Sequence, residues 1–130
     1  MARLLVAAVS AALLVSSVFA TPLERRTVTG RATWYNVETG TPTACGTIVK
    51  NDDPVVAVGA DVFDAQNCGK VVEITDPTTG KKVCGIYSES CAPCGPNDID
   101  LSPSLFEQLG SLSLGLINGV EWEVKDTCDA

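Results

Sequence analysis

Cysteine usage constrains this 130-residue chain more than any other feature of its sequence. Six cysteines occur, and all lie in the later part of the chain: Cys45, Cys68, Cys84, Cys91, Cys94 and Cys128. An even number of cysteines in a short exported chain is typical of a small domain whose core is supplemented by disulfide bonds. We therefore expect three disulfides if the chain folds in an oxidising compartment.

The N-terminus indicates such a compartment. Arg3 precedes an apolar or small run over residues 4–18, and Val18-Phe19-Ala20 ends in the small-x-small pattern of a signal-peptidase site. The run is about fifteen residues long, shorter than the roughly twenty that span a bilayer. We expect residues 1–20 to be a signal peptide and the mature protein to be secreted and extracellular.

A dibasic pair, Arg25-Arg26, ends the segment 21–26 just before the first strand-like stretch. The segment resembles a short pro-segment removed by a dibasic-cutting protease, although a plain solvated charge pair accounts for the same residues. With that cut, the mature domain comprises residues 27–130. This length suits one domain with a single small core, and we expect a monomer.

The mature domain is strongly acidic, with six basic and fifteen acidic residues and a net charge of −9. Such a surface repels phosphate backbones and anionic lipids, so nucleic acid and membranes are poor partners. Histidine is absent, which excludes His-based metal sites, His-assisted nucleophiles and an imidazole general base. No flavin-binding glycine motif is visible, and we expect neither a cofactor nor a metal.

Short strand-like segments separated by turns dominate the mature domain. They are residues 27–35, 55–59, 71–75, 81–89 and 119–124. The first and last alternate in polarity, as strands with one buried face do, and the second is a continuous apolar run typical of a strand buried on both faces. About six short strands and little helix predict an all-β fold, a closed or nearly closed barrel.

Two local signals mark the connections. An Asp-Pro turn that closes on Gly80 joins two of the strand-like segments and predicts a β-hairpin. Ser102 precedes Pro103, and the pattern that follows stops at Gly110. This predicts a short helix with Ser102 as its N-cap and Pro103 at its first position.

The stretch CAPCGPNDIDLS, residues 91–102, has several possible roles. Cys91 and Cys94 have the spacing of zinc ligands, but a second pair of this kind is missing, as is histidine. A redox dithiol requires positive charge near the thiolate, whereas nearby carboxylates surround this pair. Half-cystines that tie a loop to distant strands are the favoured interpretation.

Asp98 and Asp100 in this stretch alternate with Ile99 and Leu101. In an extended segment the two carboxylates point to one side and the two apolar side chains to the other, toward the core. The aspartates could brace the loop by accepting backbone N–H bonds, or they could face a ligand. The spacing alone does not decide between these roles.

Several motifs in this order resemble a known superfamily. They are GRATWY (residues 30–35), ACG (44–46), NCGK (67–70), CAPCGPNDIDLS (91–102) and GVEWEV (119–124). Together they cover nearly the whole mature chain and resemble fungal secreted proteins with an RlpA-like double-psi β-barrel. The superfamily also contains barwin, the first domain of expansins and the family 45 endoglucanases. The resemblance implies a six-stranded barrel, one or two short helices, and a groove that binds polysaccharide.

The resemblance also implies site residues. The acid of the superfamily falls on Asp100, the one candidate catalytic residue, and Asp98 stands beside it. Relatives place an aromatic residue of the groove at Tyr35 or Trp34. Because Trp34 shares a strand face with Val28, we expect Trp34 in the core and Tyr35 exposed as a platform for a sugar ring. Trp122 is expected in the core.

The departures from the superfamily bear on catalysis. The endoglucanases carry a second aspartate where this chain has Asn36, and an amide does not readily accept the proton of the attacking water. We therefore expect Asn36 to contact sugar, and Asp100 to be a solitary acid in its groove with no companion able to activate water. Glu89 stands where relatives often have aspartate, and we assign it no role.

The favoured function is a non-hydrolytic, expansin- or barwin-like protein that binds a cell-wall polysaccharide in its groove. One alternative is a lytic glycan-cleaving enzyme that uses Asp100 as its sole acid and base in turn. Another is a protein-binding module, such as a cysteine-protease inhibitor or secreted effector, that uses surface loops. By analogy with barwin, the expected disulfides are Cys45–Cys91, Cys68–Cys94 and Cys84–Cys128.

Overall fold

The computed structural model describes residues 10–12, 14–17 and 27–130. The expected signal peptide (1–20) falls mainly, and the expected pro-segment (21–26) entirely, outside these residues, and both stay predictions. None of the helices in the described part of the chain is long and apolar enough to cross a membrane.

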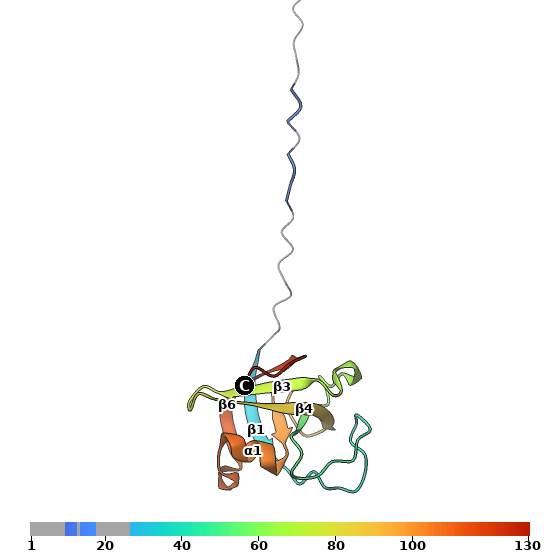
Figure 1. The fold of residues 1–130 in the computed structure, drawn as a ribbon, viewed down its shortest axis with the longest axis vertical. Coiled ribbons are helices and arrows are strands. Elements are labelled where there is room, and N and C mark those ends of the chain that lie inside the picture. The colour runs from blue at the N-terminus through green and yellow to red at the C-terminus, as the bar shows by residue number, and fades with distance from the viewer. Residues whose placement is uncertain (1–9, 13, 18–26) are drawn as a thin grey trace, which may run out of the picture.

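Six strands form a closed barrel (Figure 1). They are β1 (Val28–Trp34), β2 (Val55–Gly59), β3 (Val71–Asp76), β4 (Lys81–Cys91), β5 (Ile99–Leu101) and β6 (Leu116–Lys125). Their order around the barrel is β1-β5-β2-β4-β3-β6, with the β1–β5 and β2–β4 pairs parallel and the others antiparallel. One helix, α1 (Pro103–Leu109), and two 3₁₀ turns, η1 (Ala65–Asn67) and η2 (Leu112–Leu114), complete the described elements. The all-β barrel expected from the sequence is confirmed.

The β3–β4 hairpin forms where the sequence predicts it. Asp76 closes the turn by accepting a hydrogen bond at its carbonyl from the Gly80 N–H (2.8 Å) and at its Oδ1 from the Thr78 N–H (2.9 Å). Gly80 has a φ of 73°, a left-handed conformation that glycine adopts without steric penalty. The turn residues therefore explain the hairpin locally.

Helix α1 closes one end of the barrel. Leu105, Phe106 and Leu109 are its buried residues, and they join the core cluster. The helix begins at Pro103 as predicted, but the side chain of Ser102 caps no N–H of the helix. Its Oγ instead accepts the Val55 N–H at 3.1 Å, so this buried hydroxyl ties the helix start to β2.

The three disulfides differ in part from those implied by the resemblance. Cys84–Cys128 is present as expected, but Cys45 pairs with Cys68 and Cys91 pairs with Cys94. The pairings Cys45–Cys91 and Cys68–Cys94 are therefore wrong.

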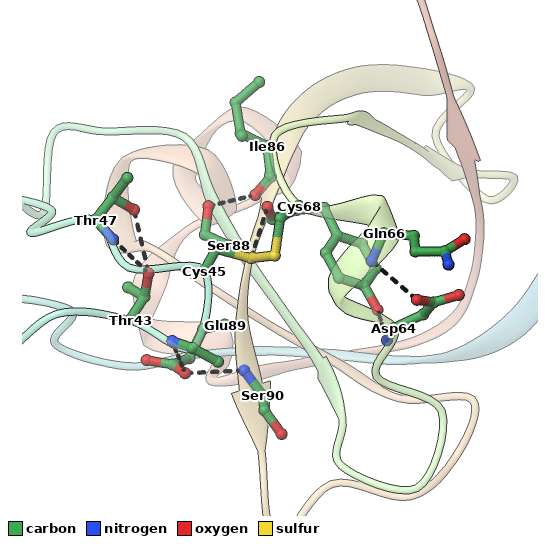
Figure 2. The surroundings of a disulfide bond; sticks show 12 residues. Thr43, Cys45, Thr47, Asp64, Gln66, Cys68, Ile86, Ser88, Glu89 and Ser90 are labelled. Atoms are coloured by element: carbon green, nitrogen blue, oxygen red, sulfur yellow. Dashed lines mark hydrogen bonds between the residues drawn. A yellow bond between two sulfur atoms is a disulfide. The ribbon is translucent and has the colours of Figure 1, made fainter.

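Two local contacts explain the observed pairs. The loops that carry Cys45 and Cys68 both dock on β4: the Cys45 N–H donates to the Ser88 carbonyl, and the N–H of the residue after Cys68 donates to the Tyr87 carbonyl. Their Cα atoms lie 5.5 Å apart, within the usual range for a disulfide (Figure 2). At the end of β4, a tight turn brings the Cα of Cys94 to 5.4 Å from that of Cys91.

Candidate functional site

Register pairing places four side chains in one row across adjacent strands. Thr33 of β1 pairs with Asp100 of β5, Asp100 pairs with Ala57 of β2, and Ala57 pairs with Glu89 of β4. Directly paired residues point to the same face of a sheet. Ile99 and Leu101, the neighbours of Asp100, are fully buried in the core, so the row lies on the outer face of the barrel.

Asp100 stands where two small hollows meet. One, of about 180 Å³, is lined by Arg31, Thr33, Cys91, Pro93, Cys94, Asp98, Asp100 and Leu116. The other, of about 200 Å³, is lined by Tyr35, Ala57, Glu89, Ser90, Cys91, Ala92, Pro93 and Asp100. We call the two together the Asp100 cleft.

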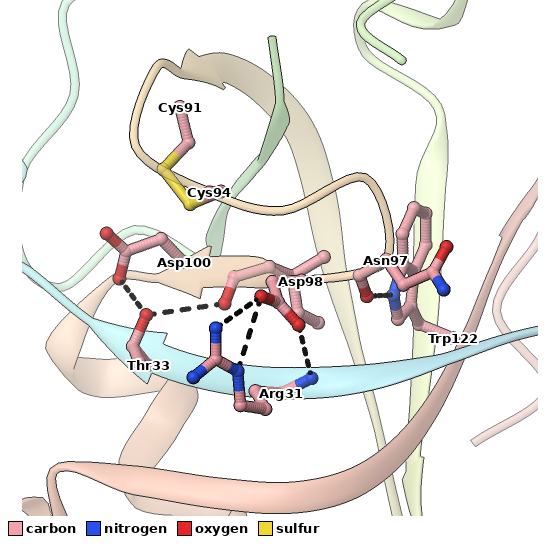
Figure 3. Close-up of polar contacts among 9 residues, drawn as sticks. Arg31, Thr33, Cys91, Cys94, Asn97, Asp98, Asp100 and Trp122 are labelled. Carbon is pink, nitrogen blue, oxygen red and sulfur yellow. Dashed lines mark hydrogen bonds and ion pairs between the residues drawn. A yellow bond between two sulfur atoms is a disulfide. The ribbon is translucent and has the colours of Figure 1, made fainter. Parts of the chain in front are cut away.

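The surroundings of Asp100 shift the pKa of its carboxyl group upward. Burial raises the pKa of its carboxyl group, while hydrogen bonds from the Thr33 hydroxyl and the Leu101 backbone partly offset that shift. The Thr33 Oγ1 lies 2.9 Å from the carboxyl oxygen of Asp100 (Figure 3). The group is only partly buried, so its carboxyl oxygens can accept hydrogen bonds from a ligand within the cleft.

Asp98 braces its loop, the first of the two roles that the sequence left open. Its Oδ1 accepts the Arg31 backbone N–H at 2.9 Å, and its Oδ2 meets the Arg31 guanidinium at 2.8 Å (Figure 3). These bonds to Arg31 hold the pKa of Asp98 below its usual range. Gly30 makes the approach possible, because a Cβ at that position would overlap the Asn97 carbonyl oxygen. Asp98 still lines the cleft, but its carboxylate is occupied by Arg31.

The aromatic residues at the end of β1, Trp34 and the following Tyr35, lie differently from the expectation. Trp34 is 36% exposed rather than in the core, and its indole Nε1 donates to the Leu112 carbonyl at 2.9 Å. Tyr35 is partly buried and lines the cleft beside Asp100. Burial, followed by the negative charges of Glu89 and Asp100, raises the pKa of Tyr35 to about 12. The phenol therefore stays protonated and can donate a hydrogen bond.

Glu89 is a further acid in the cleft beside Asp98 and Asp100, so the expectation of a solitary Asp100 is wrong. Alternation from the core residue Tyr87 would turn Glu89 inward, but β4 has an irregularity here. Val56 pairs with Tyr87 and the next residue of β2 pairs with Glu89, which leaves Ser88 as an extra residue. A bulge of this kind re-aims the side chain that follows it. Glu89 consequently faces the cleft.

Glu89 is also tied to the backbone around it. Its Oε1 accepts the Ala44 N–H at 2.8 Å and the Ser90 N–H at 2.9 Å (Figure 2). The first bond anchors the long loop between β1 and β2 to strand β4. One oxygen of this carboxylate is therefore occupied by structural hydrogen bonds.

Asn36, expected to contact sugar, points elsewhere. Its Oδ1 accepts the Glu38 N–H at 3.0 Å, and Asn36 lines neither hollow of the cleft. The structure thus brings Tyr35, Asp98 and Asp100 together and leaves Trp34 and Asn36 outside.

One cluster in the described part of the chain has atoms spaced like metal ligands: the sulfur atoms of Cys91 and Cys94 and a carboxylate oxygen of Asp100 lie within 4.8 Å of one another. The two sulfur atoms are joined in a disulfide. Metals bind cysteine as thiolate, so this donor set does not fit a metal ion while the disulfide is intact.

Comparison with known proteins identifies relatives of the chain by sequence. No model of a known protein family matches the chain. Allergen Asp f 7 of Aspergillus fumigatus is 34% identical over 98 residues, which are 72% of this chain and 35% of the relative. Expansin-like protein 6 of Dictyostelium discoideum is 31% identical over 96 residues, 67% of this chain and 32% of the relative. The chain spans about a third of the length of these curated relatives.

Solved structures share the barrel. A mutant Clavibacter michiganensis expansin in complex with cellohexaose has a TM-score of 0.66 and 26% identity, covering 81% of this chain and 54% of that one. The chain belongs to the expansin, barwin and RlpA-like double-psi β-barrel superfamily. The Streptomyces papain inhibitor also has a similar fold, with a TM-score of 0.67 and 28% identity, covering 76% of this chain and 94% of that one.

Proposed function

We propose that this chain is a secreted, expansin-like protein that binds an uncharged cell-wall polysaccharide in the Asp100 cleft without hydrolysing it. The main support for this proposal is that the aromatic ring of Tyr35 and the partly buried carboxyl group of Asp100 line one hollow on the outer face of the barrel. An aromatic ring can pack against the apolar face of a sugar, and a carboxyl group can bond its hydroxyls.

Charge favours an uncharged polymer. The cleft contains Asp98, Asp100 and Glu89, and only Arg31, already paired with Asp98, adds a positive charge among its lining residues. The chain as a whole has a net charge of −7. An acidic polysaccharide would be repelled. The cellohexaose complex of a structural neighbour supports a neutral glucan as the first ligand to test.

The arrangement of the two acids argues against inverting hydrolysis. Asp100 and Glu89 stand two strand spacings apart across Ala57, which separates their Cα atoms by about 10 Å. Inverting enzymes hold their carboxyl groups about 6.5 to 9.5 Å apart with a water between them. In this chain Oε1 of Glu89 is already occupied by two backbone N–H groups, which makes Glu89 a poor base for the attacking water. We therefore assign Glu89 to bracing the cleft wall.

A binding assay with matched variants tests the proposal. The purified protein is incubated with insoluble cellulose, chitin and peptidoglycan, and the bound fraction is measured alongside release of reducing ends. We expect retention on at least one polymer, at least tenfold weaker retention for Asp100→Asn and Tyr35→Ala, and little change for Tyr35→Phe, which keeps the ring. Glu107→Gln, an exposed acid on α1, is the control and should bind like the original protein.

The outcomes separate binding from catalysis. Equal retention of all variants would place the binding surface outside the cleft and contradict the proposal. Release of reducing ends that disappears in both Asp100→Asn and Glu89→Gln would instead show that the two acids act together as an enzyme.

A second candidate function is binding to a protein. The similarity to the Streptomyces papain inhibitor, which covers nearly all of that chain, favours it. Inhibition of papain together with no retention on any polymer would support this function over polysaccharide binding.

A further inference from the structure

The end of the barrel away from α1 contains a separate cavity. Inward-facing residues of four strands meet there: Val28 of β1, Val58 of β2, Tyr87 of β4, and Trp122 and Val124 of β6. Val62, Asn67, Pro96 and Asn97 from two loops complete its wall. At the opposite end, Leu105 and Phe106 of α1 fill the interior. The cavity thus lies at the end of the barrel opposite helix α1.

The cavity has the size of a small-molecule site. Its volume is about 490 Å³, larger than either hollow of the Asp100 cleft. Ligand pockets in proteins are typically about 300 to 1,000 Å³ and mainly apolar, with a few polar groups that orient the ligand. The cavity shares no lining residue with the cleft, so its occupancy is independent of the function proposed above.

The lining residues define the chemistry of an occupant. Four valines and a proline form most of the wall, two aromatic rings are included, and none of the lining residues is charged. An anion would be repelled by the protein as a whole, and a cation would find no partner among the lining side chains. The lining therefore favours an uncharged ligand with a ring or other apolar body.

Two polar groups of the cavity wall already make hydrogen bonds within the protein. The indole Nε1 of Trp122 donates to the Asn97 carbonyl at 2.8 Å (Figure 3), and the hydroxyl of Tyr87 accepts the Asp64 N–H at 2.8 Å. Both aromatic rings are thereby held in place, Tyr87 at 2% and Trp122 at 6% exposure. The amide side chain of Asn97, on an exposed residue, is the group best able to bond a ligand.

We propose that this cavity binds an uncharged, ring-containing small molecule, held by apolar contact with Val62, Val124 and the edge of Trp122 and oriented by the Asn97 amide. The rings and valines are pre-positioned by strand packing, which reduces the entropy lost on binding. Val62 lies at the entrance, with 43% of its surface exposed, so it can be changed without disturbing the core.

Two fluorescent probes with the same ring system test the proposal. N-phenyl-1-naphthylamine is uncharged, and 8-anilino-1-naphthalenesulfonate carries a negative charge. With the purified protein we expect saturable binding of the uncharged probe at one site per chain, and at least tenfold weaker binding of the anionic probe. Val62→Asp should weaken binding of the uncharged probe at least tenfold.

Ile48→Asp is the matched control. Ile48 is 69% exposed and lines a different apolar hollow, so its substitution should change affinity less than twofold. The chain has two tryptophans, Trp34 and Trp122, so their indole N–H resonances can be followed separately by NMR. We expect the Trp122 resonance to shift on binding and the Trp34 resonance to stay in place.

Several results would overturn the proposal. These are an absence of saturable binding, equal affinity for both probes, an unchanged affinity in Val62→Asp, or a shift confined to Trp34. A dimer that Val62→Asp converts to monomer would assign the cavity to a second copy of the chain instead. None of these results bears on polysaccharide retention, which involves the other lining residues.

Discussion

Replacing Glu89 tests whether this acid of the cleft is a structural brace. Its Oε1 accepts two backbone N–H groups, one from the β1–β2 loop and one from its own strand. Glu89→Ala removes both acceptors at once. Glu89→Gln keeps an oxygen at the same place and removes only the charge. We expect the alanine variant to be clearly less stable and the glutamine variant to be close to the original protein.

The magnitude follows from the two hydrogen bonds. Each is partly exposed to water, so we assign about 1 kcal/mol to each, and about 2 kcal/mol to the loss of both in Glu89→Ala. For a domain of this size, each kcal/mol corresponds to roughly 4 to 8 °C in Tm. A fall of about 10 °C in Tm is therefore expected for Glu89→Ala, and a change within a few degrees for Glu89→Gln.

Urea unfolding followed by tryptophan fluorescence gives the free energy of unfolding directly, and thermal unfolding by circular dichroism gives the Tm. Glu107→Ala, an exposed substitution on α1, should change stability by less than about 0.5 kcal/mol and serves as the control. Two results would refute the reasoning: a loss below about 0.5 kcal/mol in Glu89→Ala, or an equal loss in the alanine and glutamine variants. A loss below about 0.5 kcal/mol would leave Glu89 free to act chemically, whereas an equal loss in both variants would show that its charge, and not the hydrogen-bond acceptor, stabilises the fold.

Three further predictions concern the cleft and the core. Bonds to Arg31 lower the pKa of Asp98 in the folded protein. The stabilising effect of Asp98 is therefore present above the usual aspartate pKa and is lost as the pH falls through the folded-state pKa. Asp98→Ala should lower the Tm at neutral pH, and thermal unfolding measured across pH should show that this difference shrinks in acid. Burial raises the pKa of Asp100, so the ionised form of this group is disfavoured in the folded state. Asp100→Asn should therefore have a Tm equal to or above that of the original protein at neutral pH, and this advantage should disappear below about pH 4. A lower Tm at neutral pH would contradict this prediction. A Cβ on Gly85 would lie 2.5 Å from Leu105 Cδ2 of helix α1. Gly85→Ala should therefore lower the free energy of unfolding in urea by about 1 to 3 kcal/mol. An unchanged unfolding midpoint would show that α1 shifts freely.

The disulfides are expected to contribute unequally, because Cys84–Cys128 joins residues 44 apart in the sequence, whereas Cys91–Cys94 joins residues three apart. In the chain-entropy account, a long closed loop restricts the unfolded state far more than a short one. The role of Cys91–Cys94 is then local: it shapes the turn between the two hollows of the Asp100 cleft, which both include Cys91.

Much of the fold could be predicted from short-range patterns. The strand over residues 55–59, the hairpin that closes at Gly80 and the helix that begins at Pro103 lie where the sequence predicts them. Each depends on neighbouring residues, such as a turn that only certain residues can adopt or an alternation that matches the pleat. The outward placement of Asp100 follows in the same way, since Ile99 and Leu101 beside it are buried.

Other features depend on contacts between distant segments. Trp34 shares a face with Val28 in the sequence pattern, yet it ends β1 and its indole meets the Leu112 carbonyl 78 residues away. Cysteine pairing likewise depends on which loops dock beside β4, and the analogy with barwin misassigned two of the three bonds. Spacing along the chain does not report such distances.

The sequence by itself determined the barrel class, the position of most strands and the outward direction of Asp100, because these properties follow from alternation and turn chemistry within a few residues. Only the tertiary structure decided that Glu89 joins Asp98 and Asp100 in the cleft. One extra residue in β4 reverses the direction of Glu89, and strand pairing across β2 then brings it into the same cleft. A bulge is set by the partner strand, so the pattern of a single strand does not predict it.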